Sequence, residues 1–290
     1  MIGADGFVGS NVVACALAAG ASVAAVCVKD AWRLAAIVDE RLDVLLAADW
    51  HLHVPRADVV VILAYEPPPS KSVAAWLEHE LVVNAERTVS AARVAAASGA
   101  RVIFASSADV YGAWHDRPVD EGVPPEPGTP YAKAKLATEE RLASEADDLA
   151  IIRLGTVYGP SEHPRRAIPA FIAACARGEA AVVHGDGSDV RDYVYVGDVA
   201  ASVLSCVVRR PGAAVFNIGS GVGRTTLEIL RAVAGVMGME PNARFEPSER
   251  SPSRLVLDVT RARKELGLRC GTDFEAGLRE EVEWLGAAAG

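Results

Sequence analysis

Tyr131 and Lys135, four residues apart, are the pair in this sequence best suited to moving a proton. The segment TPYAKAK predicts a helix with Thr129 as its N-cap and Pro130 as its first residue, which places both side chains on one face. A lysine ammonium beside a phenol favours the phenolate and lowers the pKa of the tyrosine from about 10 towards neutral pH. Tyr131 would then serve as a general acid or base. An incidental pair on a surface helix has the same spacing, so the pattern alone does not decide.

A serine hydroxyl is expected close to this pair. The apolar segment ARVIFASS predicts a buried strand that ends at Ser106 and Ser107. Ligands of α/β sheets bind at the carboxyl ends of the strands, which is where these hydroxyls emerge. A serine that only caps the following loop fits the same pattern.

Three glycines at the start of the chain have the spacing of a dinucleotide-binding turn. Gly3, Gly6 and Gly9 precede an apolar helical segment, so backbone N–H groups and the helix N-terminus would face a pyrophosphate. Among 25 glycines such a triplet also arises by chance. A buried strand normally precedes the turn, and here only Met1 and Ile2 do, so the sequence predicts that the first strand is missing or truncated.

The elements that position these residues alternate between helix and strand. Helices are predicted over 7–20, 31–42, 72–99 and 131–145, and strands over 22–28, 43–49, 57–65, 100–107 and 149–155. Short apolar strands alternating with helices predict a doubly wound, Rossmann-like parallel sheet covered on both faces. We expect a dinucleotide-binding domain over residues 1–157 and a smaller mixed α/β substrate-binding lobe over 158–290, with segments near 190–220 returning to the main sheet.

Composition excludes several classes of function. A net charge of −9 and a pI near 5.2 argue against a nucleic-acid or anionic membrane partner. The five cysteines are scattered without a Cys-x-x-Cys spacing, which favours a reducing compartment and no metal site. Residues 12–28 carry no charge, but AAGAS interrupts them and no basic segment precedes them, so we expect a helix and a strand in a cytoplasmic protein.

The order of these motifs is more specific than any one of them. GADGFVGS, ADVVVILAY, VVNAERT, IFASSADVYG, PYAKAKLATE, IIRLGTVYGP, VVHGDGSDVRDYVYVGDVA, FNIGSG and LDVTRARKELG follow one another along nearly the whole chain. In this series the chain resembles the extended short-chain dehydrogenase/reductase family, in its NAD-dependent nucleotide-sugar epimerase/dehydratase branch.

The resemblance implies a role for each catalytic residue. Tyr131 would exchange a proton with a sugar hydroxyl, and Ser107 would hydrogen-bond the same oxygen. Lys135 would hold the nicotinamide ribose and tune Tyr131.

The resemblance also implies the binding residues. For the cofactor they are Gly3, Gly6, Phe7, Val8, Gly9, Asp49, Ala64, Asn84, Tyr131 and Lys135, with Asp49 near the adenine and Asn84 in a structural role. For a nucleotide-diphosphate sugar they are Ser107, Thr156, Arg191 and Arg250, with Arg254 as an alternative to Arg250. Thr156 stands where many relatives have an asparagine. A pocket with arginines and without carboxylates would suit a diphosphate.

Two departures from the family pattern affect the cofactor and the reaction. Cys27 occupies the position at the strand end where NAD-using relatives have an acidic residue, while Asp30 and Lys29 follow it. NAD is the expected cofactor, and NADP is left open. Dehydratases have an Asp-Glu pair after the strand-end hydroxyl, whereas this chain has Ala108 and Asp109, which disfavours dehydration.

We therefore expect a C4 epimerase of a UDP- or dTDP-hexose that works through a transient keto-sugar and bound NAD. One alternative is an NADPH-dependent reductase of a keto-sugar nucleotide or another carbonyl, and a further one is a catalytically silent relative. A homodimer is the family expectation.

The start of the chain carries a prediction of its own. Burying about five apolar side chains of a central first strand contributes on the order of 10 kcal/mol, against about 5–15 kcal/mol for a whole domain. We accordingly expect Met1 to be an internal start, with the natural reading frame beginning upstream.

Overall fold

The computed structural model describes residues 1–28, 30–68, 73–248, 252–268 and 271–288. Its strands are β1 Val23–Cys27, β2 Leu42–Leu46, β3 Val59–Ile62, β4 Arg101–Ser107, β5 Leu149–Leu154, β6 Thr156–Tyr158, β7 Ala181–His184, β8 Val190–Tyr195, β9 Ala214–Ile218, β10 Gly223–Thr225, β11 Ala243–Glu246 and β12 Arg254–Leu255. Its α-helices are α1 Phe7–Ala18, α2 Val73–His79, α3 Glu86–Ala97, α4 Pro130–Glu145, α5 Ala167–Ala176, α6 Val196–Arg209, α7 Thr226–Val236, α8 Thr260–Leu266 and α9 Phe274–Ala288. The segments η1 Trp32–Leu34 and η3 Ala108–Tyr111 are short 3-10 helices, and η2 Glu80–Ala85 is a π-helix.

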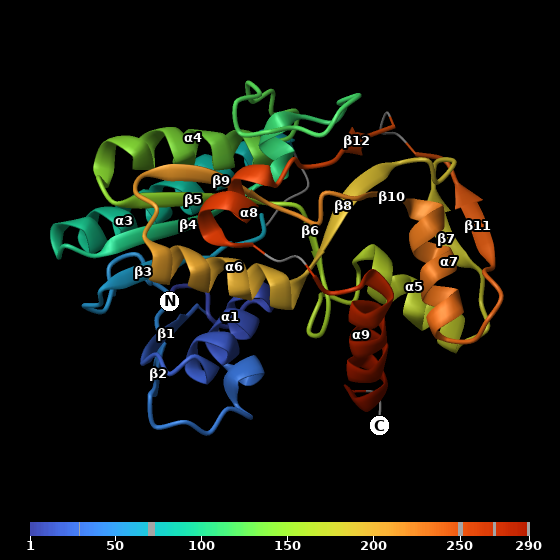
Figure 1. Cartoon of the computed structure of the whole chain (residues 1–290), viewed down its shortest axis with the longest axis horizontal. Coiled ribbons are helices and arrows are strands. Elements are labelled where there is room, and N and C mark those ends of the chain that lie inside the picture. Colours follow the sequence, from blue (N-terminus) through green and yellow to red (C-terminus); the bar gives the residue numbers. More distant parts are fainter. Residues whose placement is uncertain (29, 69–72, 249–251, 269–270, 289–290) are drawn as a thin grey trace.

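The main sheet is parallel, as the sequence predicts. β3, β4, β5 and β9 pair in that order, and β1 pairs with β2 at the other end. β9 comes from the C-terminal half of the chain and returns to the edge of this sheet (Figure 1).

The centre of the sheet is occupied by the start of the chain. Ile2 forms parallel bridges to Val26 and to Ile62, and its N–H donates to the carbonyl of Val61 at 2.9 Å. The first strand, expected to be missing or truncated, is thus reduced to this single fully buried residue, which joins β1 to β3. A cavity of about 630 Å³, lined by Met1 and by residues of both strands, lies beside it.

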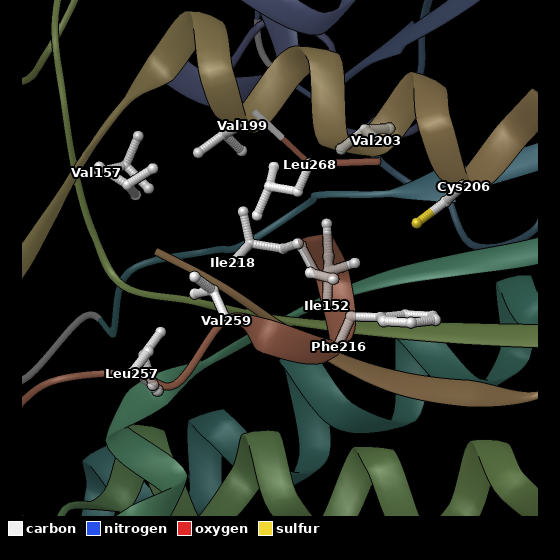
Figure 2. Packing of buried hydrophobic residues seen from close by; sticks show 14 of the residues in the cluster. Ile152, Val157, Val199, Val203, Cys206, Phe216, Ile218, Leu257, Val259 and Leu268 are labelled. Atoms are coloured by element: carbon white, nitrogen blue, oxygen red, sulfur yellow. The ribbon is translucent and has the colours of Figure 1, made fainter. Parts of the chain in front are cut away.

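Helices cover both faces of the sheet (Figure 1). On one face, side chains of α1, α6 and α8 pack on β4, β5 and β9, and Figure 2 shows Val199 and Val203 of α6 above Ile152 and Phe216. On the other face, α3 packs on β3, β4 and β5 through Val89 and its alanines, and α4 packs there through Leu142. The two buried layers give the doubly wound architecture.

A smaller lobe carries the remaining strands. β8 pairs with β6, β10 and β12, while β7 pairs with β11. Helices α5, α7 and α9 enclose a separate apolar cluster around Tyr158, Phe171 and Leu230. Within the described residues, no helix is both long and apolar enough to cross a bilayer.

The helix expected over 31–42 is wrong. Only the turn Trp32–Leu34 is helical, and the end of the segment enters β2 instead. Val38 is 98% exposed, and Ile37 and Leu42 are only partly buried against the cluster that holds Leu34, so burial supports only a short turn in this segment.

Candidate active site

A cavity of about 570 Å³ lies at the carboxyl ends of the central strands, between the sheet and the smaller lobe. Residues of the main sheet and its helices line one side: Phe7, Val8, Tyr65, Trp76, Ser107, Asp109, Tyr131 and Lys135. Residues of the smaller lobe and its connections line the other: Thr156, Glu162, His163, Arg166, Arg191 and Asp192. The location matches the ligand position of doubly wound sheets.

Ser107 and Tyr131 meet in this cavity. Ser107 ends β4, and its hydroxyl accepts a hydrogen bond from the N–H of Asp109 at 3.2 Å. Tyr131 lies in the first turn of α4, which Thr129 caps by accepting from the N–H of Ala132 at 3.2 Å. Ser107 and Tyr131 both line the cavity, and the interaction with the Ser107 side chain favours the phenolate of Tyr131, so the two hydroxyl-bearing side chains lie at the same part of the pocket wall.

Lys135 lies one helical turn further along α4. Its ammonium donates to the carbonyl of Ala105 at 2.8 Å and lies 4.7 Å from the centre of the Phe104 ring. Burial lowers the pKa of Lys135 to about 8, and the carboxylates of Glu80 and Glu139 oppose that shift. The structure thus brings Ser107, Tyr131 and Lys135 to one site.

The expected lowering of the Tyr131 pKa is wrong for this structure. Burial raises the pKa of Tyr131, and the negative charge of Asp109 raises it further. The Lys135 ammonium lies 5.7 Å from the centre of the tyrosine ring and donates to a backbone carbonyl, so it does not offset desolvation.

The glycine turn is shaped by close backbone approach. Gly3 has φ +81°, and a Cβ there would lie 2.6 Å from the backbone nitrogen of Ala64. A Cβ on Gly9 would collide with the carbonyl oxygen of Gly3. Larger residues at either position would push α1 away from the strand ends.

The N-terminus of α1 fits a pyrophosphate. Its N-cap, Gly6, makes no side-chain cap, and no acidic residue lies in the first turn. First-turn N–H groups and the positive end of the helix dipole are therefore available to an anion. Arg33 lies over the turn, donating to the carbonyl of Asp5 at 2.9 Å and to Ser161 Oγ at 2.6 Å.

Asn84 holds the loop after β3 in place. Its amide oxygen accepts from the N–H of Glu66 at 2.8 Å, and its amide nitrogen donates to the carbonyl of the same residue at 2.9 Å. This pairing fixes the segment that begins with Ala64, beside Gly3. Asp49 lies after β2, at the same edge of the sheet, in an exposed ion pair with His53.

The pocket is not free of carboxylates, contrary to the sequence-based expectation. Arg191 pairs with Asp109 at 3.2 Å, and Arg166 pairs with Glu162 at 3.3 Å. Asp109 follows β4 of the main sheet and Arg191 lies in β8 of the smaller lobe, so this pair forms only because the two lobes pack together. Thr156 lines the pocket as the first residue of β6.

Four further positions singled out from the sequence are Lys29, Arg250, Arg254 and Cys27. Arg250 and Lys29 lie outside the described residues. Arg254 begins β12, where its carbonyl and N–H bond residues of the 113–115 segment. Cys27 is fully buried at the end of β1, and burial raises the pKa of its thiol to about 11, so the strand end there is uncharged.

Some pocket residues were not found from the sequence. Tyr65, Trp76, Glu162 and Arg166 line the cavity, and Glu80 stands behind its aromatic wall. No spacing rule singles out these side chains in the sequence.

Comparison with known proteins agrees with this architecture. The model of the NAD dependent epimerase/dehydratase family matches residues 1–219. Over 216 residues the chain is 33% identical to a UDP-glucose 4-epimerase of Mycolicibacterium smegmatis, covering 71% of this chain and 69% of that protein. Over 240 residues it is 35% identical to the low-salt glycan biosynthesis protein Agl12 of Haloferax volcanii, covering 80% and 76%. The solved structure of MoeE5 in complex with UDP-glucose and NAD has a TM-score of 0.88 and 28% identity, covering 100% of this chain and 98% of that chain.

Proposed function

Because this chain belongs to the NAD-dependent epimerase/dehydratase family, we propose that it is a nucleotide-sugar 4-epimerase acting on a UDP- or dTDP-hexose. The observation that carries the proposal is the meeting of Ser107, Tyr131 and Lys135 in one cavity, next to Ala108. Ala108 is buried and stands where dehydratases of this family have a carboxylate, so the acid for water loss is absent from that position.

NAD is the family's cofactor, and the residues of this site suit it. The turn from Gly3 to Gly9 and the N-terminus of α1 would hold the pyrophosphate. Lys135 and Tyr131 would hold the nicotinamide ribose. The remaining proposed contacts come from Phe7, Val8, Asp49, Ala64 and Asn84.

The chain's own residues would move the proton. When bound, NAD supplies hydride transfer at C4, first away from the sugar and then back to it. Tyr131 takes the proton of the C4 hydroxyl during oxidation and returns it during reduction, while Ser107 hydrogen-bonds the same oxygen. The Lys135 ammonium, which donates to the carbonyl of Ala105 one helical turn from Tyr131, would hold the nicotinamide ribose next to that oxygen.

The substrate's diphosphate would be bound by arginine. Arg191 and Arg166 both line the cavity, and a guanidinium matches the oxygens of a diphosphate in pairs. Thr156 adds a hydroxyl on the same side. Two of the similar solved proteins, MoeE5 and the UDP-glucose 4-epimerase of Thermotoga maritima, are complexes with UDP-glucose.

A panel of UDP- and dTDP-sugars, assayed with and without added NAD, NADH or NADPH, tests the function. An epimerase interconverts C4 epimers with no net change in NADH absorbance. Net consumption of NADPH with formation of a reduced sugar would instead establish the reductase alternative.

The matched control is Tyr131→Phe, which keeps the ring and removes the exchangeable proton. We expect it to lower kcat by about 10²–10⁴-fold while sugar-nucleotide binding changes little. A wild-type protein without saturable NAD binding or turnover of any sugar would contradict the proposal.

A further inference from the structure

A buried carboxylate stands behind the aromatic wall of the cavity. Glu80 is 1% exposed and begins the π-helical stretch Glu80–Ala85 between α2 and α3. Such stretches are rare and occur frequently at functional sites. Neither the proton transfer at Tyr131 nor the nucleotide contacts proposed above make use of this residue.

Three donors converge on the two oxygens of Glu80. The hydroxyl of Tyr65 donates to Oε1 at 2.8 Å, and the indole N–H of Trp76 donates to the same oxygen at 2.9 Å. The amide of Asn84 donates to Oε2 at 3.1 Å. Because both aromatic rings line the cavity, Glu80 fixes two side chains of the pocket wall from behind.

The same cluster reaches the catalytic pair. The ring of Tyr65 packs edge-on against the ring of Tyr131, with their centres 5.3 Å apart. Glu80 is also the carboxylate that most strongly favours the charged form of Lys135, ahead of Glu139. A buried ammonium needs such a counter-charge because desolvation otherwise favours its neutral form.

Glu80 and Glu139 differ in how far their charges are already neutralised. Glu139 is held by Arg153, with the guanidinium Nη2 2.6 Å from Oε2. In the described part of the chain, Glu80 forms no ion pair within 4.0 Å. Its charge is therefore balanced by neutral donors only, and its field acts on Lys135 and Tyr131.

We propose that Glu80 is a positioning residue of the active site, which anchors Tyr65 against Tyr131, holds Trp76 in the cavity wall and supplies the counter-charge for Lys135. The contribution to catalysis rests on the proposed function, whereas the counter-charge role can be measured without any substrate. Glu80 touches neither substrate nor cofactor in this assignment and acts through its neighbours.

Other charges face the same residues and must be separated from Glu80. The ionisable groups around the cluster are Glu139, Arg153, Asp109, Arg166, Glu66, Arg87 and His79. None of them changes in a Glu80→Gln variant, so a shift between that variant and the wild type reports Glu80 alone. The substituted side chain keeps a carbonyl oxygen, which still accepts from Tyr65 and Trp76.

The test is the titration of Lys135 by NMR in the full-length protein labelled with ¹³C at lysine Cε, without ligands. The sequence contains five lysines, so the Lys135 signal is assigned by its loss in a Lys135→Arg protein. We expect Glu80→Gln to move the titration midpoint down by on the order of one pH unit. A midpoint within about 0.2 of the wild type would overturn the counter-charge role, because an opposite charge nearby shifts a pKa by at least several times that much.

The control is Glu78→Gln, which removes the same charge from an exposed position two residues earlier in α2. It should leave the Lys135 midpoint unchanged; an equal shift in both variants would also overturn the assignment. If Glu80→Gln does not fold, Glu80→Asp withdraws the carboxylate by one methylene and keeps its charge. A lower midpoint in Glu80→Asp supports the proposal, and an unchanged one refutes it.

Enzymatic assays then connect the cluster to the reaction. The descending alkaline limb of kcat/KM should shift to lower pH in Glu80→Gln, with KM changing less than kcat. A protein that shows the Lys135 shift but turns over no sugar nucleotide would retain the Glu80 assignment and reject the epimerase. If the protein turns over sugar nucleotides but Glu80→Gln does not shift the Lys135 midpoint, the epimerase is retained and the Glu80 assignment is rejected.

Discussion

Asp109 and Arg191 form an ion pair at 3.2 Å across the cavity that holds Ser107 and Tyr131. The two residues are 82 positions apart, one following β4 and the other in β8. The guanidinium therefore already faces the pocket, held by a carboxylate that a diphosphate would replace as its partner.

Arg191→Ala should weaken substrate binding more than catalysis. A charged hydrogen bond contributes about 1.5–3 kcal/mol, so we expect KM for the sugar nucleotide to rise by about 10–100-fold while kcat changes less than about threefold. Steady-state kinetics and calorimetric binding measure both quantities. Arg177→Ala removes an exposed arginine paired with Glu179 and serves as the control. An unaltered KM in Arg191→Ala would exclude this residue from diphosphate binding.

Asp109→Asn should change the pH dependence of the reaction. The Asp109 charge is the largest charge effect that raises the pKa of Tyr131, second only to burial. Activity that requires the phenolate rises with pH through this pKa, so removing the charge moves the rising limb of kcat/KM to lower pH, by up to about one unit. Asp116→Asn, an exposed aspartate that accepts from Trp114, is the control. If the rising limb of kcat/KM in Asp109→Asn stays at the wild-type pH or moves to higher pH, this explanation is contradicted.

Two helical glycines give a matched test of the dinucleotide turn. A Cβ on Gly9 of α1 would collide with the carbonyl oxygen of Gly3, whereas a Cβ on Gly235 of α7 has no neighbour within 4 Å. Gly9→Ala should therefore lower NAD affinity at least about tenfold and reduce the melting temperature. Gly235→Ala should keep NAD affinity and stabilise the protein by about 0.5–1 kcal/mol. Equal NAD affinities in the two variants would show that the turn does not bind the cofactor.

Two buried carboxyl groups should make stability fall with rising pH. Glu281 of α9 is fully buried and interacts electrostatically with Glu162, and within the described residues neither of its carboxyl oxygens has a hydrogen-bond partner. Burial raises the pKa of both groups above the ordinary carboxyl range, with repulsion from Glu162 raising that of Glu281 further. The folded protein thus retains protons that the unfolded chain has released. The stabilisation is complete below the unfolded pKa, near about 4.3 for glutamate, and is lost as pH rises through the folded values.

Glu281→Gln isolates this effect. The wild type should lose up to about 1.4 kcal/mol of unfolding free energy per pH unit for each retained proton, relative to the variant, over the range above about pH 5. Denaturant unfolding at a series of pH values between about 5 and 9 measures the difference. Glu283→Gln, an exposed residue of the same helix, is the control. Parallel pH curves for the wild type and Glu281→Gln would rule out a proton retained by Glu281 in the folded state.

Much of the main sheet could be predicted because the sequence patterns that specify its strands and helix ends lie within a few neighbouring residues. Apolar runs such as 57–65 and 100–107 specify buried parallel strands, and Thr129 with Pro130 specifies the start of α4. The predicted helix over 31–42 is wrong because Leu34 is buried while Val38 is exposed to solvent, a difference in burial that periodicity alone does not reveal. The interruption of the 72–99 helix by a π-helical turn also has no sequence signal.

The sequence by itself determined the parallel sheet, the glycine turn and the chain positions of Ser107, Tyr131 and Lys135. These depend on interactions within a few residues, namely backbone geometry, capping and alternation of apolar side chains. Only the tertiary structure decided that Ile2 joins β1 to β3, that Asp109 faces Arg191, and that burial raises the pKa of Tyr131. It also decided that Glu80 stands behind the catalytic pair. Desolvation and pairing between distant charges depend on how separate elements pack, and one-dimensional spacing does not specify that packing.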